Sequence, residues 1–414
     1  MKRVAKIFLG FLLTLFVAAI VLPMIFKDKI RELIIAEFEK STEATIYFDI
    51  DQFSLSMIKN FPNFTIGLGD FGVVGKGIFE GDTLVSVEDL EARVNLSDVL
   101  FGDAISIKGV DLESPSFMII ALADGSANYD IAKPSETPDP VAEESEGSVS
   151  FGIQSFSVSN GDFIYFDQGA KVIMDLAGVN LRGRGDFAED IFDLLSSGSI
   201  ESVNLNYDGT EYVTDKKLDL DLVMSMDLPN STYTFKENTF AINEFPLHLD
   251  GSFSMLDDGY GMDISFDSPS SDFKKILSLV PGVYTQEFKD ITATGAAAFG
   301  GKVSGRYSEN QMPAFNLSLN ITDGQFQYPG LTESINDVQV NLKVDNKDGV
   351  IENTLVDLKQ MHMKFGKNPF DASLQVMNLK RLPYQSQIQG QPEPGRSQQD
   401  DSHGRLWHGR PAEH

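Results

Sequence analysis

The stretch Leu90-Glu91-Ala92-Arg93-Val94-Asn95-Leu96 alternates an apolar residue with a polar one at every step. A period of two puts Leu90, Ala92, Val94 and Leu96 on one face of a β-strand and the polar residues on the other. The same alternation recurs in residues 46–51, 218–222, 315–321 and 338–344. The sequence therefore predicts a mostly β protein whose strands each bury one face.

Turn-forming dipeptides separate many of these segments. Asp-Gly occurs six times, beginning at residues 124, 208, 250, 258, 323 and 348, and Asn160-Gly161 adds a seventh pair. Such dipeptides tolerate the positive φ of tight hairpins, so the sequence predicts antiparallel pairing between consecutive strands. Only two short helices are predicted in this region, over 187–195 and over 272–280, the second ended by Pro281-Gly282.

Residues 7–26 carry no charge. A helix of that length spans about 30 Å, the thickness of the hydrocarbon core of a bilayer. The alternative is a cleaved signal peptide, with Val17-Ala18-Ala19 as the cleavage region. We expect an uncleaved anchor because the apolar run continues to residue 26, with the six residues before it cytoplasmic and the rest exported. The anchor residues chosen are Ile7, Phe11, Leu15, Ile20 and Phe26.

Changes in pattern divide the chain. We expect a cytoplasmic tail and transmembrane anchor (1–26), an amphipathic helix (27–44), a first β module (45–132), an acidic Pro-rich linker (133–148), a second β module (149–381) and a disordered tail (382–414). The tail holds the only tryptophan, Trp407, and three arginines but no lysine, whereas lysine predominates elsewhere. This change of composition favours a frameshift or a misjoined gene end over a natural disordered tail.

Composition excludes several classes of function. Sixty-one acidic residues against 33 basic ones give a net charge of −28, which would repel a nucleic acid backbone. The absence of cysteine excludes disulfides, thiol catalysis and cysteine-ligated zinc. His248 and His362 have no partner at a metal-ligand spacing, and the GxGxxG pattern at 67–72 lacks the helix that a dinucleotide site requires. We therefore predict no catalytic, cofactor-binding or metal-binding residues, and no enzyme.

Strands with one apolar face must cover that face. They can close into a barrel, stack a second sheet, or line a groove for an apolar ligand. A membrane anchor favours the groove, because acyl chains are the apolar ligand at hand. On this hypothesis Leu90, Ala92, Val94 and Leu96 are lipid-facing.

Several segments resemble the AsmA family of Gram-negative envelope proteins. The family's N-terminal region is similar to Asn60-Phe61-Pro62-Asn63-Phe64, to residues 79–84 and to residues 124–130, where Tyr129 stands at a position that is commonly tryptophan. Residues 267–290 and Asn368-Pro369-Phe370 resemble the larger members. The resemblance covers about residues 1–381, and because full-length relatives run further it implies a C-terminally truncated chain.

The resemblance implies an elongated, partly rolled antiparallel β-sheet with an apolar groove, akin to chorein-type bridge proteins. It also implies a single-pass protein of the inner membrane with most of its chain in the periplasm. The implied role is outer-membrane biogenesis and the movement of phospholipid between membranes, with the inner membrane, phospholipid and envelope proteins as partners. A non-enzymatic envelope scaffold that binds proteins through its sheet edges is the alternative.

Overall fold

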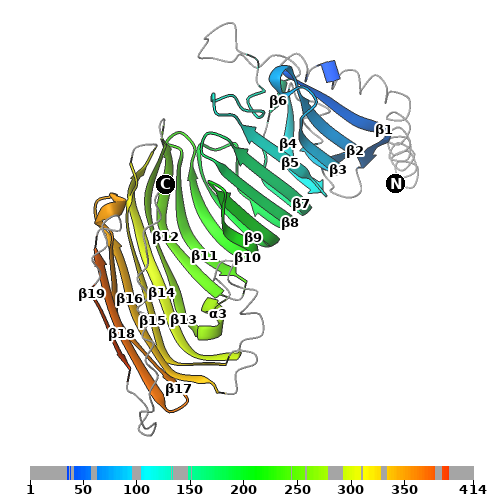
Figure 1. The fold of residues 1–414 in the computed structure, drawn as a ribbon. Helices are drawn as coiled ribbons and strands as arrows, with labels where there is room; N and C mark the ends of the chain where they lie inside the picture. Colours follow the sequence, from blue (N-terminus) through cyan, green and yellow to red (C-terminus); the bar gives the residue numbers. More distant parts are fainter. Residues whose placement is uncertain are drawn as a thin grey trace, which may run out of the picture.

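The fold is a single curved β-sheet (Figure 1). The computed structural model describes residues 35–36, 38, 42–56, 63–95, 104–131, 133, 148–150, 152–243, 245–256, 259–277, 292–308, 311–327, 333–377 and 385–390. In these ranges nineteen strands belong to one sheet, and the only helices are one α-helical turn and two short 3-10 helices beyond the helical residues near 35–38. The predicted mostly β fold with few short helices is confirmed.

The elements follow one another closely along the chain. The first group is β1 (Ala44–Ser56), β2 (Asn63–Gly75), η1 (Gly77–Phe79), β3 (Thr83–Asn95), β4 (Ala104–Glu113), β5 (Ser116–Ala121) and β6 (Ser148–Ser150). The middle group is β7 (Ser155–Asp167), β8 (Val172–Arg184), β9 (Ile191–Tyr207), β10 (Thr210–Asp227), β11 (Thr232–Ile242), β12 (Phe245–Leu256), β13 (Gly259–Asp272) and α3 (Phe273–Leu277). The last group is β14 (Thr292–Tyr307), β15 (Ala314–Gln327), β16 (Ile335–Asn346), η2 (Ile351–Asn353), β17 (Leu355–Phe365), β18 (Asn368–Met377) and β19 (Gln385–Gly390).

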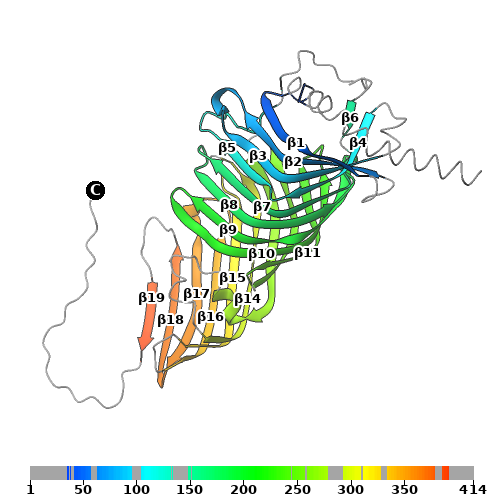
Figure 2. The same cartoon turned by 90° about the vertical axis from the view of Figure 1, so that its right-hand side faces the viewer.

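Strand order follows chain order. Consecutive strands pair antiparallel from β1 to β4 and again from β7 to β19. Between these runs β7 pairs in parallel with β4 and β5, and β6 pairs in parallel with β4. The two predicted β modules therefore join into one sheet. Among the described strands β1 pairs only with β2 and β19 only with β18, so these two strands are the ends of an open sheet and not of a closed barrel (Figure 2).

A line of backbone kinks crosses the sheet. Residues with positive φ lie inside strands at Asp70, Asn160, Gly178, Asp215, Asp323 and Asp337. The pairing register shifts beside several of them, as in β7 between Val158 and Gly161. Bulges of this kind bend a strand and increase its twist. They also reverse the pleat, so Val158 and Phe163, five residues apart, pack into the same cluster.

The predicted turns were partly wrong. The dipeptides at 124, 208 and 348 lie in turns or loops between strands, but those at 160, 250 and 323 lie inside β7, β12 and β15. The dipeptide that begins at 258 is described only for Gly259, the first residue of β13. The same property explains both positions, because a residue that tolerates positive φ can form a bulge inside a strand as well as a hairpin turn.

One predicted helix is confirmed and one is wrong. Phe273 of α3 is buried against Ala293, Ala297, Ile321 and Val338, which confirms a helix inside 272–280, although 278–280 lie outside the described residues. The helix predicted over 187–195 does not form. Residues 191–195 begin β9 and pair with β10, so sheet pairing overrides the local apolar spacing.

The predicted anchor at 7–26 lies outside the described residues, as does most of the predicted helix at 27–44. Its described residues 35, 36 and 38 are helical, and Ile35 and Phe38 pack against Ala44, Ile46 and Val73. In the portion of the chain that the structure describes, no helix is long and apolar enough to cross a membrane. Within 382–414, predicted to be disordered, residues 385–390 form β19 on the edge of β18.

Candidate functional site: an apolar face along the open sheet

One face of the sheet carries apolar side chains from strand to strand. Successive Cα partners in the first half are Leu68 on β2, Leu90 on β3, Leu112 on β4, Val158 on β7 and Leu181 on β8. Directly paired residues place their side chains on the same face. These residues therefore form a ladder that crosses the parallel junction between the two halves, and we call the side of the sheet that carries it the apolar face.

The ladder continues through the last third of the sheet. Phe299 of β14 pairs with Leu319, which pairs in turn with Leu342, Leu358 and Leu374 on β16, β17 and β18. These are half-buried positions. The apolar face therefore also runs across β14 to β18, near the end of the sheet opposite β1.

Aromatic rings fill the middle of the apolar face. The ring centroids of Tyr233 and Phe253 lie 4.9 Å apart on β11 and β12. Phe299 contacts Phe266 at 5.6 Å and Phe245 at 6.0 Å, connecting β12 and β13 to β14. Offset or edge-on ring pairs at such distances stabilise a sheet face beyond the area they bury. The abundance of phenylalanine in the sequence therefore has a structural role here.

The opposite face is charged. Ion pairs join neighbouring strands or positions at Arg93–Asp111 (3.2 Å), Lys217–Asp219 (3.2 Å), Lys302–Asp263 (2.6 Å) and Lys364–Asp337 (2.7 Å). A hydrogen bond of 2.7 Å joins Nδ1 of His362 to the carboxylate of Asp371. The hydrogen bond from Lys302 holds the pKa of Asp263 below its usual value. Solvent-exposed pairs contribute little to stability. Their importance is that they mark this side, which we call the charged face, as the side in contact with water.

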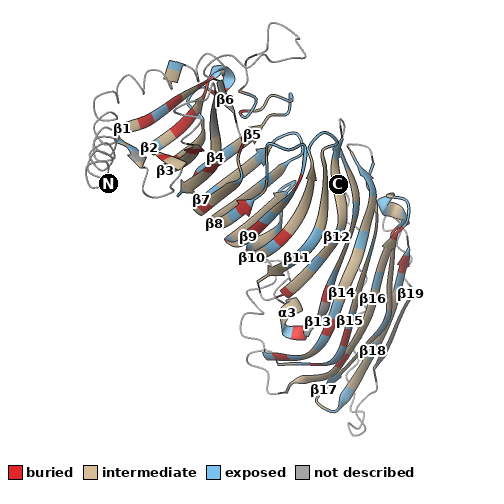
Figure 3. Cartoon of the chain, turned by 180° about the vertical axis from the view of Figure 1, so that it is seen from behind, coloured by how far each residue is buried: buried red, intermediate tan, exposed pale blue. Residues whose placement is uncertain are grey.

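The apolar face is only partly covered. Leu68 and Val158 are buried, but Leu90, Leu112 and Leu181 are half-buried. Most of the strand length is of intermediate burial, with short buried stretches (Figure 3). Among the described residues the nineteen strands form one layer, without a second sheet stacked on the apolar side. Of the three ways to cover an apolar strand face, the barrel and the sheet sandwich are absent from the described part of the chain.

Tyr165 of β7 is half-buried and lies two residues after Phe163, on the apolar face. Burial raises the pKa of Tyr165 on β7 to about 12, together with its hydrogen bond to Asp167 (2.9 Å) and the electrostatic effect of the phenols of Tyr129 and Tyr260.

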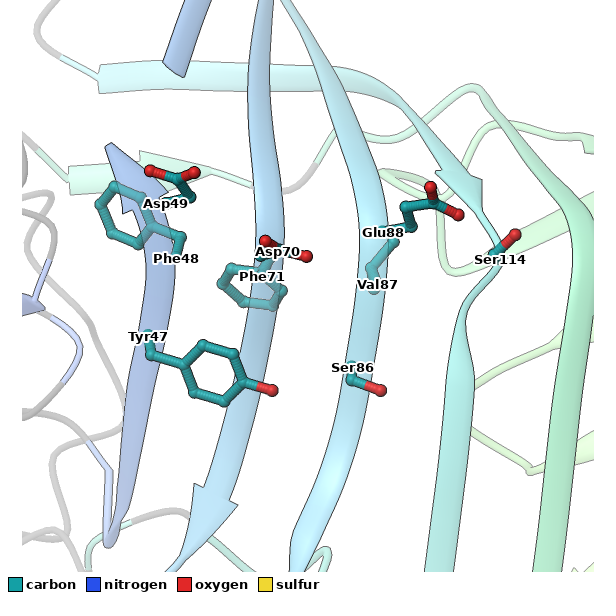
Figure 4. Close-up of a pocket in the computed structure, with 9 residues that line it drawn as sticks. All are labelled: Tyr47, Phe48, Asp49, Asp70, Phe71, Ser86, Val87, Glu88 and Ser114. Atoms are coloured by element: carbon teal, nitrogen blue, oxygen red, sulfur yellow. The ribbon is translucent and has the colours of Figure 1, made fainter. Parts of the chain in front are cut away.

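A separate hollow of about 600 Å³ lies between β1, β2 and β3 and reaches Ser114 (Figure 4). It lies on the line of kinks at Asp70, and its lining combines the apolar rings of Phe48 and Phe71 with the carboxylates of Asp49, Asp70 and Glu88. The lining contains no histidine, lysine or cysteine to act with these carboxylates. Across the described residues, no group of three histidine or acidic side chains is placed to hold a metal ion.

The sequence pattern of the AsmA family matches residues 1–229. The chain belongs to the AsmA family. The matched region covers β1 to β10 and ends in the turn after β10, while β11 to β19 continue the same sheet. Among curated proteins none matches the chain. AsmA is not a known enzyme family, and membership indicates a role connected with the cell envelope or with lipid.

In this AsmA protein the predicted residues Leu90, Ala92 and Val94 lie on β3 and pair with Leu112, Val110 and Ile107 of β4. They share the apolar face, and Glu91 and Arg93 lie on the charged face. Whether they contact lipid stays a prediction. Leu96 and the anchor residues Ile7, Phe11, Leu15, Ile20 and Phe26 lie outside the described residues.

Sequence reasoning missed most of the apolar face of the AsmA sheet. The ladder on β14 to β18 and the aromatic rings of β11 to β14 were not singled out, although the alternation in 315–321 and 338–344 is their signal. Alternation does not give the pairing register between strands, and this register decides that Leu319 lies beside Leu342. The continuity of the face is therefore a property of the sheet and not of any one strand.

Proposed function

We propose that this AsmA protein holds phospholipid by its acyl chains on the apolar face and conducts it along the sheet between membranes. Residues 7–26 would anchor the chain in the inner membrane, with most of the protein in the periplasm, in the service of outer-membrane biogenesis. The observation that carries the proposal is the ladder of paired apolar side chains on an open sheet.

The energetics suit a conduit. Each methylene moved from water onto an apolar surface contributes about 0.8 kcal/mol, without any directional contact. At about 4.8 Å between neighbouring strands, the sheet from β2 to β18 extends for roughly 65 Å. Successive positions such as Leu319, Leu342 and Leu358 offer nearly the same surface. An acyl chain that leaves the leucine of one strand therefore meets an equivalent surface on the next strand. It can slide along the sheet without a high-affinity binding site.

The test is photo-crosslinking with a matched pair on one strand. A photoreactive amino acid at Leu220, on the apolar face of β10, should capture phospholipid in cells and in detergent extracts. The same group at Asp221, the next residue and on the charged face, should not. Leu90 and Glu91 form a second pair on β3. Mass spectrometry of the adducts identifies the lipid, and equal labelling of both faces, or none, contradicts the proposal.

A scaffold that binds proteins through sheet edges is the second candidate, favoured by β1 and β19, which among the described strands pair on one side only, with β2 and β18. An edge strand offers unpaired backbone groups to a strand from another chain. The two functions separate in the same experiment. A scaffold gives protein adducts from groups placed along β1 and no lipid adducts from Leu220.

A further inference from the structure

Two loops near the start of the sheet lie side by side around a hollow. The first, residues 76–82, carries η1 between β2 and β3, and the second, residues 122–131, follows β5. The hollow has a volume of about 250 Å³, and its lining takes Ile78 from the first loop and Ile131 from the second. The amide of Glu43, just before β1, donates to the carbonyl of Ile131 (2.6 Å). The hollow therefore marks the place where the chain enters the sheet.

Each of the two loops turns one large side chain inward and another outward. In the first loop Phe79 is buried, while Ile78 is 69% exposed, the highest value of any large hydrophobic residue in the described part of the chain. In the second loop Asn128 is buried and its side chain is hydrogen-bonded to β5, while Tyr129 is 55% exposed. The buried neighbours fix the backbone, so the fold itself holds Ile78 and Tyr129 in solvent.

The length of the chain ties this end of the sheet to the proposed anchor. Ile35 and Phe38 pack against Ala44 and Val73 at the start of the sheet. The proposed anchor ends at Phe26, nine residues before Ile35. A chain advances at most about 3.5 Å per residue, so Ile35 lies within about 30 Å of the end of the anchor.

The exposed side chains at this end suit the surface of a bilayer. A single exposed isoleucine is ordinary on a protein. Here it lies near a tyrosine, a residue enriched at the boundary of lipid and water because its ring is apolar and its hydroxyl polar. The lining of the hollow also contains Glu43 and Asp130, and the chain has a net charge of −28. Apolar contact, and not attraction to anionic lipid, would therefore hold this surface on a membrane.

We infer that this end of the sheet docks on the bilayer that holds the anchor, with Ile78 and Tyr129 inserted among the phospholipid headgroups. The inference rests on the proposed function, because it takes residues 7–26 as the anchor, and it adds a second contact with the membrane. The first loop joins β2 and β3, on which Leu68 and Leu90 begin the apolar ladder. Docking brings the start of the ladder to the lipid that it would receive.

The experiment measures the membrane contact of single side chains in the full-length protein, reconstituted into phosphatidylcholine vesicles. The chain has no cysteine, so Ile78→Cys carries an environment-sensitive fluorophore at one position only. Ile351→Cys is the matched control, because Ile351 is also an exposed isoleucine (42%) in a 3-10 helix but precedes β17, near the other end of the sheet. Emission at position 78 should shift to the blue and be lost when spin-labelled phosphatidylcholine is included. Emission at position 351 should do neither.

A second substitution tests the insertion itself. With the fluorophore at position 129, through Tyr129→Cys, the further change Ile78→Asp should abolish quenching, because a carboxylate resists transfer out of water. Ile351→Asp in the same labelled protein should leave quenching unchanged. Both isoleucines are exposed, so both variants should keep the circular dichroism of the wild type.

The outcomes separate docking from the conduit. If the protein floats with the vesicles and positions 78 and 351 are both unquenched, the inference is wrong and the proposed function stands. If the protein does not float with them, the anchor is wrong and docking fails with it. If position 78 is quenched but a photoreactive group at Leu220 captures no phospholipid, docking stands and the conduit fails. A blue shift at position 78 without quenching identifies contact with protein and overturns the inference.

Discussion

Replacement of Gly295 by alanine should destabilise the sheet strongly, because this glycine occupies a kink that no other residue fits. Its φ is 117°, and a Cβ built there would lie 2.6 Å from the Cα of Gly324 and 2.7 Å from the carbonyl oxygen of Asp323. A side chain in that backbone region costs about 1–3 kcal/mol. Forcing β15 away from β14 adds about 1–3 kcal/mol. We expect a loss of about 3 kcal/mol or more in the free energy of unfolding.

The matched control is Gly261→Ala on β13. A Cβ at Gly261 would make only ordinary contacts, 3.7 Å from Leu256 and 3.8 Å from Ser254, and its φ is not positive. This substitution should be neutral or stabilise by up to about 1 kcal/mol through the unfolded chain. Urea unfolding followed by tyrosine fluorescence compares both variants with wild type. If Gly295→Ala unfolds at the same urea concentration as Gly261→Ala, kinks do not shape this sheet.

Three further substitutions test the fold. Asn128→Ala should cost about 2–4 kcal/mol and expose β5 to protease, because the buried Asn128 amide donates to the carbonyl of Met118 (2.7 Å) and accepts from the Ile120 amide (2.9 Å). Phe273→Ala should lower the free energy of unfolding by about 3–5 kcal/mol, because it leaves a cavity between α3 and the sheet; urea unfolding measures the loss. Tyr165 has a folded pKa of about 12, above its unfolded value, so its neutral phenol adds stability that is complete below about pH 10 and lost as pH rises toward 12. Tyr165→Phe should reduce the pH dependence of the free energy of unfolding between about pH 10 and 12.

Alternation in the sequence predicts the strands and their faces well. Leu90 and Val94 lie on one side of β3, and Glu91 and Arg93 on the other, as a period of two requires. The apolar or polar nature of each side chain sets this pattern locally, without reference to the rest of the chain. The parallel pairing of β7 with β4 and β5 was not predictable in this way. It depends on how the chain returns after residue 133, and hairpin-forming dipeptides carry no information on that return.

The dipeptides show the limit of local reasoning. Asp208-Gly209 and Asp323-Gly324 are chemically the same, and the two aspartates have φ of 49° and 51°. The first pair forms the turn between β9 and β10, and the second is a bulge inside β15. Local energetics favour positive φ at both. Only the strands on either side decide whether the chain reverses or continues, so the sequence predicts the kink and not its consequence.

The phase of the apolar–polar alternation distinguishes a bulge from a turn, which the dipeptides alone do not. A strand that bends at a bulge must slip its apolar residues by one position to keep them on the same face. Leu176 and Val179 on β8 lie three residues apart with Gly178 at φ 64° between them, and both join one buried cluster. Val158 and Phe163 do the same around Asn160. A slip in phase beside Asn, Asp or Gly therefore identifies a bulge, because a turn would end the alternation instead of shifting it. In this sheet the slip allows one apolar face to continue past the kinks, and a curved conduit depends on that continuity.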